Sequence, residues 1–417
     1  MIRARARCFH IHSSLYRRRL VAVATRFRAT SRRERREDMR AIATRARALA
    51  PRSTSRASRR SNAPRASARA SRATDDYPSV MADAARAVRL AGALCRKMQF
   101  ELRTNEKVSK SDDSPVTVAD FAAQAVVSHV LGVARPDVGL VAEEDARSMR
   151  EPAGAKLRAR VTAVVNDALE GVVERRLSEE EVMDAIDRGA TDGGATGSFW
   201  ILDPIDGTKG FINGRQYAIA LALMEDGEVT GGVLGCPNMP SEKIPRGATE
   251  IPTAAPGVIF VAYKGRGTTV GAFDAEHPVR DGAKITTNKV ASSSEATYME
   301  SWGDSIVADH GFTNSLSAAM GVTAPPVRID SMAKYGALAR GDTNMYLRFP
   351  PASYREKVWD HAAGAIVVQE AGGVITDGAG NPLDFSKGRF LDIDIGIVAT
   401  SSPELHATLL ETIAKVR

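Results

Sequence analysis

The uneven distribution of charge along the chain limits the part of it that can fold. Through Asp76 the sequence holds 22 Arg, no Lys and five acidic residues, a net charge of +17, whereas the other residues carry 35 basic and 45 acidic side chains, a net charge of −10. The first stretch is built from Arg, Ala and Ser, as in residues 53–61, and has few large apolar side chains to bury. It cannot form a core of its own, so we expect the folded part to lie within residues 77–417.

A composition rich in Arg and Ser and poor in acids is typical of an organelle transit peptide. We therefore expect residues 1–76 to be a disordered transit peptide, removed when the protein is imported into the chloroplast or the mitochondrion. A secretory signal would need a continuous apolar centre, which residues 20–24 are too short to supply. Two alternatives stay open: the segment is a basic arm that binds nucleic acid, or Met81 is an internal start that bypasses it.

The remaining composition argues against a membrane protein and against a disulfide framework. No uninterrupted run of about 18 apolar residues occurs, so we expect no membrane span. Cys95 and Cys236 stand far apart and match no metal-binding or disulfide spacing. We expect two buried thiols, with a regulatory disulfide between them as the alternative.

Hydrophobic spacing predicts a two-domain, layered α/β (α+β) protein. Apolar residues recur at helical intervals in residues 80–98 and 117–131, and short apolar runs that indicate strands follow at 138–142, 199–202, 218–224, 229–234 and 258–262. The Pro-rich segment 237–256 marks the boundary between the domains. We expect an N-terminal metal-binding α+β domain at 77–245 and a C-terminal α/β domain at 246–417, with alternating layers of helices and sheets.

Three acidic groups stand where predicted strands or loops end. They are Glu143 with its two acidic neighbours, the pair Asp203 and Asp206, and Asp360. Each alone has an ordinary explanation, because an Asp before a helix is usually a cap and a run of acids is usually a solvated surface. Taken together, they become candidates for one site.

The residues that follow the strand at 199–202 suggest what such a site would bind. Pro204 fixes a turn between the two carboxylates, Gly207 removes the side chain where a phosphate must approach the backbone, and Thr208 starts a helix whose free N–H groups favour an anion. Carboxylates would repel a phosphate dianion unless hard cations lie between them, and ligands that are all oxygens select Mg²⁺. The expected chemistry is metal-assisted transfer of a phosphoryl group to water.

These residues carry a resemblance to a known family. The chain resembles the lithium-sensitive, magnesium-dependent phosphatases related to inositol monophosphatase, through WILDPIDGT at residues 200–208 and WDHAAG at 359–364. Within that superfamily it is most similar to the 3'(2'),5'-bisphosphate nucleotidases, through KSDDSPVTVAD at 110–120, KGF at 209–211 and DSMAKYG at 330–336. The resemblance runs from about Met81 to the end of the chain. It implies the two-domain sugar-phosphatase-like fold.

The resemblance also implies roles for individual residues. Two or three Mg²⁺ ions would be held by the carbonyl of Ile205 and by the side chains of Glu143, Asp203, Asp206 and Asp360. Asp120 and Thr208 would activate the attacking water, the carboxylate holding the threonine hydroxyl. Substrate binding would fall to Thr208, His310, Ser331, Lys334 and Arg348, in which Lys and Arg suit a second, uncleaved phosphate. Asp309-His310-Gly311 and Asp113 depart from the usual family pattern.

The implied function is hydrolysis of the 3'-phosphate of adenosine 3',5'-bisphosphate to AMP and phosphate, with the 5'-phosphosulfate form as a further substrate. The resemblance places this role in sulfate assimilation and implies inhibition by lithium. The main alternative is an inositol mono- or polyphosphate 1-phosphatase, which would use the same metal chemistry. A distant alternative is a non-catalytic nucleotide- or RNA-binding protein. We expect a monomer or weak homodimer with a small-molecule substrate, no nucleic acid and no membrane.

Overall fold

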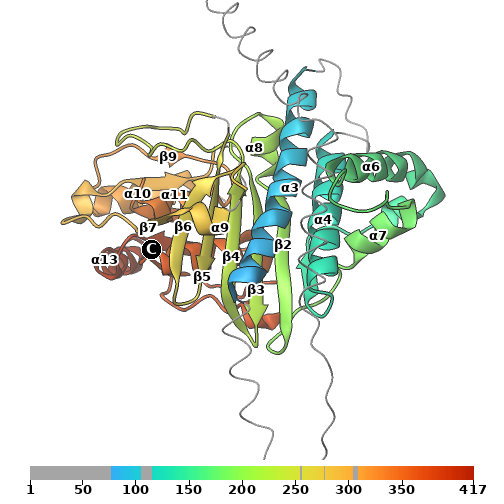
Figure 1. The fold of residues 1–417 in the computed structure, drawn as a ribbon. Coiled ribbons are helices and arrows are strands. Elements are labelled where there is room, and N and C mark those ends of the chain that lie inside the picture. Colours follow the sequence, from blue (N-terminus) through green and yellow to red (C-terminus); the bar gives the residue numbers. More distant parts are fainter. Residues whose placement is uncertain (1–76, 105–114, 254–255, 277, 304–308) are drawn as a thin grey trace, which may run out of the picture. The chain divides into compact units, whose positions relative to one another are not determined.

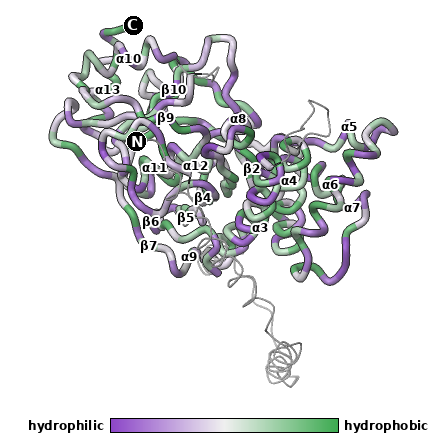
Figure 2. Tube along the Cα trace, turned by 90° about the horizontal axis from the view of Figure 1, so that it is seen from above, coloured by the Kyte–Doolittle hydropathy of each residue, from purple (hydrophilic) through white to green (hydrophobic). Residues whose placement is uncertain are grey.

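In the computed structural model, helices and sheets alternate in layers (Figure 1). The structure describes residues 77–104, 115–253, 256–276, 278–303 and 309–417, all within the unit Ala68–Arg417. The expected transit segment and the residues before Pro115 in the 110–120 motif lie outside the described residues. Figure 2, seen from above, shows α3 and α4 beside one sheet and α10 and α13 at the opposite end.

Within the residues that the structure describes, helices and strands follow one another in a mixed order. The helices of four or more residues are α3 (Tyr77–Thr104), α4 (Pro115–Ala134), α5 (Arg147–Arg150), α6 (Ala155–Ala168), α7 (Glu179–Asp187), α8 (Thr208–Ile212), α9 (Pro278–Asp281), α10 (His310–Ala319), α11 (Ala333–Arg340), α12 (Ala362–Glu370) and α13 (Pro403–Val416). The strands are β1 (Gly139–Ala142), β2 (Ser198–Asp206), β3 (Ala218–Glu225), β4 (Glu228–Cys236), β5 (Val258–Tyr263), β6 (Gly267–Ala272), β7 (Ala283–Ile285), β8 (Tyr298–Glu300), β9 (Val327–Arg328), β10 (Met345–Arg348), β11 (Val374–Asp377) and β12 (Ile397–Thr400). Short 3-10 turns include η3 (Val358–Asp360).

The larger sheet has the order β1-β2-β3-β4-β5-β6-β7 and is covered by helices on both faces. Because side chains alternate along a strand, Trp200 and Leu202 of β2 join the core under α3 and α4, whereas Phe199 and Ile201 join the core under α11 and α12. All four side chains are buried. A strand buried on both faces carries an unbroken apolar run, which is why the sequence signal at this position is strong.

The smaller sheet has the order β11-β12-β10-β8-β9 and packs against the other side of α11 and α12. Its outer face is covered by α10 and α13, whose apolar residues Leu316, Leu405 and Leu409 form a third core. The layers are therefore helix, sheet, helix, sheet, helix. The prediction of alternating layers is confirmed.

The helix α4 is strongly apolar. Its segment Val116–Ala134 has a mean hydropathy of 1.5 and is, by length and composition alone, long and apolar enough to cross a membrane. However, 67% of that window is buried inside the protein, against α3, α6 and β2. This burial is what a core helix of a globular unit requires.

Most predicted elements are present, but β6, β7, β9, β12 and α13 were not predicted. The boundary expected between residues 245 and 246 falls between β4 and β5, which pair within one sheet. The division into two domains stays a prediction. Cys95 and Cys236 are both buried free thiols, as expected.

Candidate active site

The first two acidic groups meet because β1 and β2 are parallel neighbours. Ala142 pairs with Leu202, so Glu143 follows β1 at the same edge of the sheet where Asp203 continues β2. The pairing of β2 with β3 shifts register between Asp203 and Asp206. A register shift of this kind bends the strand and turns its side chains, and Pro204, which has no N–H for the ladder, lies inside it. Both aspartates still pair with β3, and they flank the irregular end of β2.

Asp203 lies at the centre of a cluster of acids. Only 2% of its surface is exposed, and its pKa is raised well above the ordinary value, first by burial and then by the charges of Glu143, Asp206, Asp360 and Asp120. These groups come from α4, the end of β1, β2 and η3. We call Asp120, Glu143, Asp203, Asp206 and Asp360 the carboxylate site.

The same charge crowding acts on the neighbours of Asp203. Burial, followed by Glu143 and Asp145, raises the pKa of Glu144 to about 7, against the charge of Lys357. Burial, partly offset by Arg348 and His361, raises the pKa of Asp360 to about 6. Burial and then the charges of Glu144 and Glu143 raise the pKa of Asp120 well above the ordinary value. A site with so many carboxylates held out of water needs cations to keep them ionised.

The donor set fits magnesium. The carboxylate site and the carbonyl of Ile205 offer only oxygen atoms, and both cysteines of the described residues are buried free thiols. Hard divalent cations prefer such ligands. The residues expected to bind the metal are therefore brought together by the fold.

The loop after Asp206 is held by the DSMAKYG segment. Gly207 has a φ of 84°, and a Cβ at this position would lie 2.7 Å from the Cβ of Ser331. Ser331 itself has a φ of 69°, and the carboxylate of Asp206 accepts a hydrogen bond from the backbone N–H of Met332. Only glycine combines this backbone conformation with such close contact. Ser331 therefore lies directly against the loop that carries Asp206 and Thr208.

Thr208 begins α8, which packs against α4, the helix that carries Asp120. The hydroxyl of Thr208 is 3.4 Å from the carbonyl oxygen of Ile205, to which it donates. In the part of the chain that the structure describes, no hydrogen bond joins Asp120 to Thr208. The two residues expected to activate water thus lie on adjacent helices, and their direct contact stays a prediction.

Lys334, in the first turn of α11, places a buried positive charge beside the carboxylate site. It is 2% exposed, its Nζ donates to the carbonyl of Ile329 at 2.9 Å, and it lies 5.2 Å from the ring centre of Tyr346. Burial lowers the pKa of Lys334 to about 8, while Asp206 and Asp330 act in the opposite direction. An ammonium group held in this way can bind an anion without first losing much freedom.

The sequence profile of the inositol monophosphatase family matches residues 77–417. The chain belongs to the inositol monophosphatase family. The family depends on Mg²⁺, which agrees with the donor set described above.

Within the inositol monophosphatase family, the chain is similar to several proteins named 3'(2'),5'-bisphosphate nucleotidase. A rice protein named 3'(2'),5'-bisphosphate nucleotidase is 45% identical over 347 residues, which cover 82% of this chain and 95% of that protein. The Arabidopsis thaliana 3'(2'),5'-bisphosphate nucleotidase 1 is 46% identical over 303 residues, covering 71% and 84% of the two chains. A protein of the same name from Emericella nidulans is 40% identical over 337 residues, covering 76% and 92%.

Solved structures share the fold at low sequence identity. An inositol monophosphatase from Zymomonas mobilis superposes with a TM-score of 0.51 at 19% identity, over 81% of this chain and 98% of that chain. CysQ from Bacteroides thetaiotaomicron, described as a bacterial member of the inositol monophosphatase family, gives a TM-score of 0.51 at 17% identity, over 78% and 98%. These matches confirm the fold.

Arg348 and His310, both expected to bind the substrate, each have an acidic partner in the structure. Arg348 lies beside Asp360, but its planar fork holds Glu356, with Nε and Nη2 each 2.7 Å from a carboxylate oxygen. His310 begins α10, with Nδ1 2.8 Å from an oxygen of Glu300, a buried residue outside the carboxylate site. Their contacts with a phosphate stay a prediction, and any such contact by Arg348 would use the rest of its guanidinium.

Several residues around the site were missed by the sequence reasoning. Arg389 donates to the carbonyl of Ala142 at 2.5 Å and to that of Gly189 at 3.1 Å, and so fixes the end of β1 that carries Glu143. Lys357 lies 3.6 Å from a carboxylate oxygen of Glu143. Nothing in the local sequence marks either residue, because Arg389 is about 250 residues from its partner in β1 and acts through backbone atoms.

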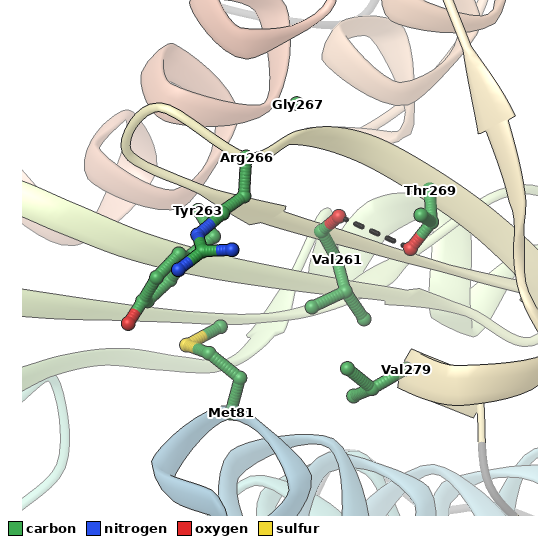
Figure 3. Close-up of a pocket in the computed structure, with 7 residues that line it drawn as sticks. All are labelled: Met81, Val261, Tyr263, Arg266, Gly267, Thr269 and Val279. Atoms are coloured by element: carbon green, nitrogen blue, oxygen red, sulfur yellow. Dashed lines mark hydrogen bonds between the residues drawn. The ribbon is translucent and has the colours of Figure 1, made fainter. Parts of the chain in front are cut away.

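A second pocket, which differs from the carboxylate site in its mainly apolar lining, lies between α3, β5, β6 and α9 (Figure 3). It has a volume of about 190 Å³ and is lined mainly by apolar atoms, including those of Met81, Val261 and Val279. The hydroxyl of Thr269 in its wall is turned to the carbonyl of Val261 at 3.4 Å. No carboxylate lines it, so it offers no ligands for a divalent cation.

Proposed function

We propose that this protein is a Mg²⁺-dependent phosphatase that removes the 3'-phosphate of adenosine 3',5'-bisphosphate, giving AMP and inorganic phosphate. The observation that carries the proposal is the buried Lys334 next to Asp206, which adds an anion-binding charge to a metal-binding carboxylate site. Relatives 40–46% identical are named 3'(2'),5'-bisphosphate nucleotidases, which supports the same substrate class here. The 5'-phosphosulfate form is a second proposed substrate.

Two or three Mg²⁺ ions would be held by the four acids Glu143, Asp203, Asp206 and Asp360 and by the carbonyl of Ile205. When bound, such ions polarise the phosphoryl group and lower the pKa of water. The residues of the chain would then orient the reactants. Without the ions, burial and the nearby acids raise the pKa of Asp120 well above its ordinary value.

In the proposed reaction a water oxygen attacks phosphorus, the bond from phosphorus to the 3'-oxygen breaks, and that oxygen takes a proton from solvent water, to which the proton of the attacking water is finally returned. The Thr208 hydroxyl would orient the water, with Asp120 as the acceptor of its proton. Lys334 and Arg348 would bind the uncleaved phosphate, while Ser331 and His310 would contact the nucleotide. Charge-assisted hydrogen bonds of this kind are about twice as strong as neutral ones, so they suit a dianionic group.

A second candidate function is hydrolysis of inositol phosphates, because the family profile that matches the chain is that of inositol monophosphatase. The metal chemistry would be identical. The two functions differ in the second anion site, which inositol 1-phosphate does not need.

The deciding experiment measures phosphate release by the full chain with Mg²⁺ from adenosine 3',5'-bisphosphate, inositol 1,4-bisphosphate and inositol 1-phosphate. We expect a strong preference for the nucleotide and complete loss of activity with EDTA. Preference for an inositol phosphate would keep the metal site and refute the nucleotide assignment. Absence of release from all three would refute the phosphatase proposal.

We further propose that LiCl inhibits the reaction while KCl at the same concentration does not, because a small monovalent ion can occupy a site that one Mg²⁺ leaves. Import into the chloroplast or the mitochondrion with loss of residues 1–76 is a separate proposal, supported by the Arg- and Ser-rich composition. N-terminal sequencing of the native protein would test it, and an intact first segment would contradict it.

A further inference from the structure

A buried chain of polar side chains runs from the core of the protein to Asp360. The hydroxyl of Tyr335 lies 2.8 Å from Nδ1 of His361, and Nε2 of His361 lies 2.9 Å from Oε2 of Glu356. Both oxygens of Glu356 are 2.7 Å from nitrogens of Arg348. Nη2 of Arg348 then lies 3.3 Å from Oδ2 of Asp360. The chain therefore ends at a residue of the carboxylate site.

Glu356 is the branch point of this network. It is completely buried, and so is His361. Because an ionised carboxylate only accepts, Nε2 of His361 donates to Glu356, and Nδ1 is left to the Tyr335 hydroxyl. Burial raises the pKa of Glu356, but the charges and hydrogen bonds of Arg348 and His361 outweigh that effect and hold the pKa well below its ordinary value.

Packing fixes the far end of the network. Tyr335 is 1% exposed, and its ring occupies the space where a Cβ on Gly364 would stand, with Cδ2 2.0 Å from that position. Glycine at this position lets α11 and α12 approach each other closely. Tyr335 thus cannot rotate without moving α12, the helix that starts directly after Asp360 and His361.

The network controls how Arg348 meets Asp360. With Nε and Nη2 of Arg348 engaged by Glu356, only the side of the guanidinium formed by Nη1 and Nη2 is left to face other partners. Only Nη2 reaches Asp360, and it reaches Oδ2. Without Glu356, Arg348 would be free to swing onto Asp360 and pair with both of its oxygens.

We propose that Glu356 is a positioning residue for the metal site: it directs Arg348 to a single oxygen of Asp360 and leaves the other oxygen for a Mg²⁺ ion. The proposal rests on the metal role of Asp360 in the proposed function. Partners that orient the ligands of a metal typically contribute about 10- to 100-fold to metal affinity or activity. Glu356 would act in this way without touching metal or substrate.

A different role is conceivable from distances alone. Single ligand atoms of Glu356, Asp360 and His361 lie within 4.8 Å of one another, close enough for one metal ion. The hydrogen bonds of Glu356 to Arg348 and His361 argue against this arrangement, because binding a metal ion would require breaking them. The two roles predict different numbers of bound ions.

The test compares Glu356→Gln with the wild type by calorimetric titration of the full chain with Mg²⁺, without substrate. The amide keeps the size of the side chain but loses the charge that orients Arg348. We expect the Mg²⁺ dissociation constant to rise about 10- to 100-fold with an unchanged number of ions. Asp342→Asn is the matched control, because Asp342 also forms a buried pair with an arginine, at 2.6 Å from Arg340, outside the carboxylate site. Its Mg²⁺ affinity should stay within about threefold of the wild type.

Unchanged Mg²⁺ affinity in a folded Glu356→Gln protein would overturn the proposal, and so would the loss of one bound ion. If that variant does not fold, Tyr335→Phe removes one hydrogen bond at the other end of the network and should still weaken Mg²⁺ binding by about two- to fivefold. Identical affinity in that variant would then overturn the proposal. Because no substrate is present, a wild type that binds Mg²⁺ but releases no phosphate would refute the proposed function and leave this test valid.

Discussion

Replacing Lys334 by methionine tests whether the buried ammonium group binds the second phosphate. The two side chains have similar length, and the site is 2% exposed, so methionine fills the same space with apolar atoms. The burial that lowers the pKa of Lys334 to about 8 also means that the charged form is costly to keep in the folded protein. Removing the charge relieves that cost but leaves the carbonyl of Ile329 without its donor, so we expect the stability to change by no more than about 1–3 kcal/mol.

The expected loss follows from the geometry of the ammonium group. Lys334 has one donor engaged with Ile329 at 2.9 Å, and an ammonium group carries three. A hydrogen bond to a charged group contributes about 1.5–3 kcal/mol, which corresponds to about 10- to 150-fold in binding. We expect this loss in kcat/KM for adenosine 3',5'-bisphosphate, mainly through a higher KM. Inositol 1-phosphate has one phosphate, so its hydrolysis should change by less than about threefold.

The assay is phosphate release with saturating Mg²⁺, run for both substrates and accompanied by thermal unfolding. Lys264→Met serves as the control, because Lys264 is an exposed residue that pairs with Glu228 away from the site. Equal losses for the two substrates would show that Lys334 serves the metal site rather than a second phosphate. An unchanged KM for the nucleotide would refute the reasoning altogether.

Three further predictions concern the carboxylate site. Asp203→Asn should reduce turnover to background while the metal-free protein unfolds at the wild-type temperature or above, since the amide removes a buried charge; full activity would show that Asp203 is not a metal ligand. In EDTA, the unfolding temperature should rise as the pH falls from about 7.5 to 5. The pKa values of Glu144 and Asp360, about 7 and about 6 in the folded protein, lie above their unfolded values, so the folded state binds more protons in this range. Thermal melts that show lower stability on acidification over this range would contradict that sign. Arg389→Met should lower the free energy of unfolding, measured with denaturant, by about 1–3 kcal/mol, because the carbonyls of Ala142 and Gly189 lose their donor. The same substitution should lower the Mg²⁺-dependent kcat. An unaffected kcat would mean that Arg389 does not position Glu143.

The amino-acid sequence alone determined the layered fold and the chemistry. The unbroken apolar run before Asp203 is the mark of a strand covered on both faces, and the turn from Pro204 to Thr208 is specified by residues whose backbone preferences are local. Gly207 is a clear case for the backbone, because its φ of 84° favours glycine; the neighbour that its missing side chain admits is Ser331, and the approach of a phosphate stays a prediction. Such signals can be read from one sequence because they depend on near neighbours in the chain.

Only the tertiary structure decided which charges meet. Whether Glu143 and Asp203 face each other depends on the parallel pairing of β1 with β2, and the position of β1 depends in turn on Arg389 from the other end of the chain. The sequence could not show that Glu356 occupies the fork of Arg348, because a carboxylate eight residues away carries no sign of its partner. Local conformation depends on adjacent residues. Electrostatic partners depend on packing, which brings together groups that are far apart in the sequence and follow no fixed spacing.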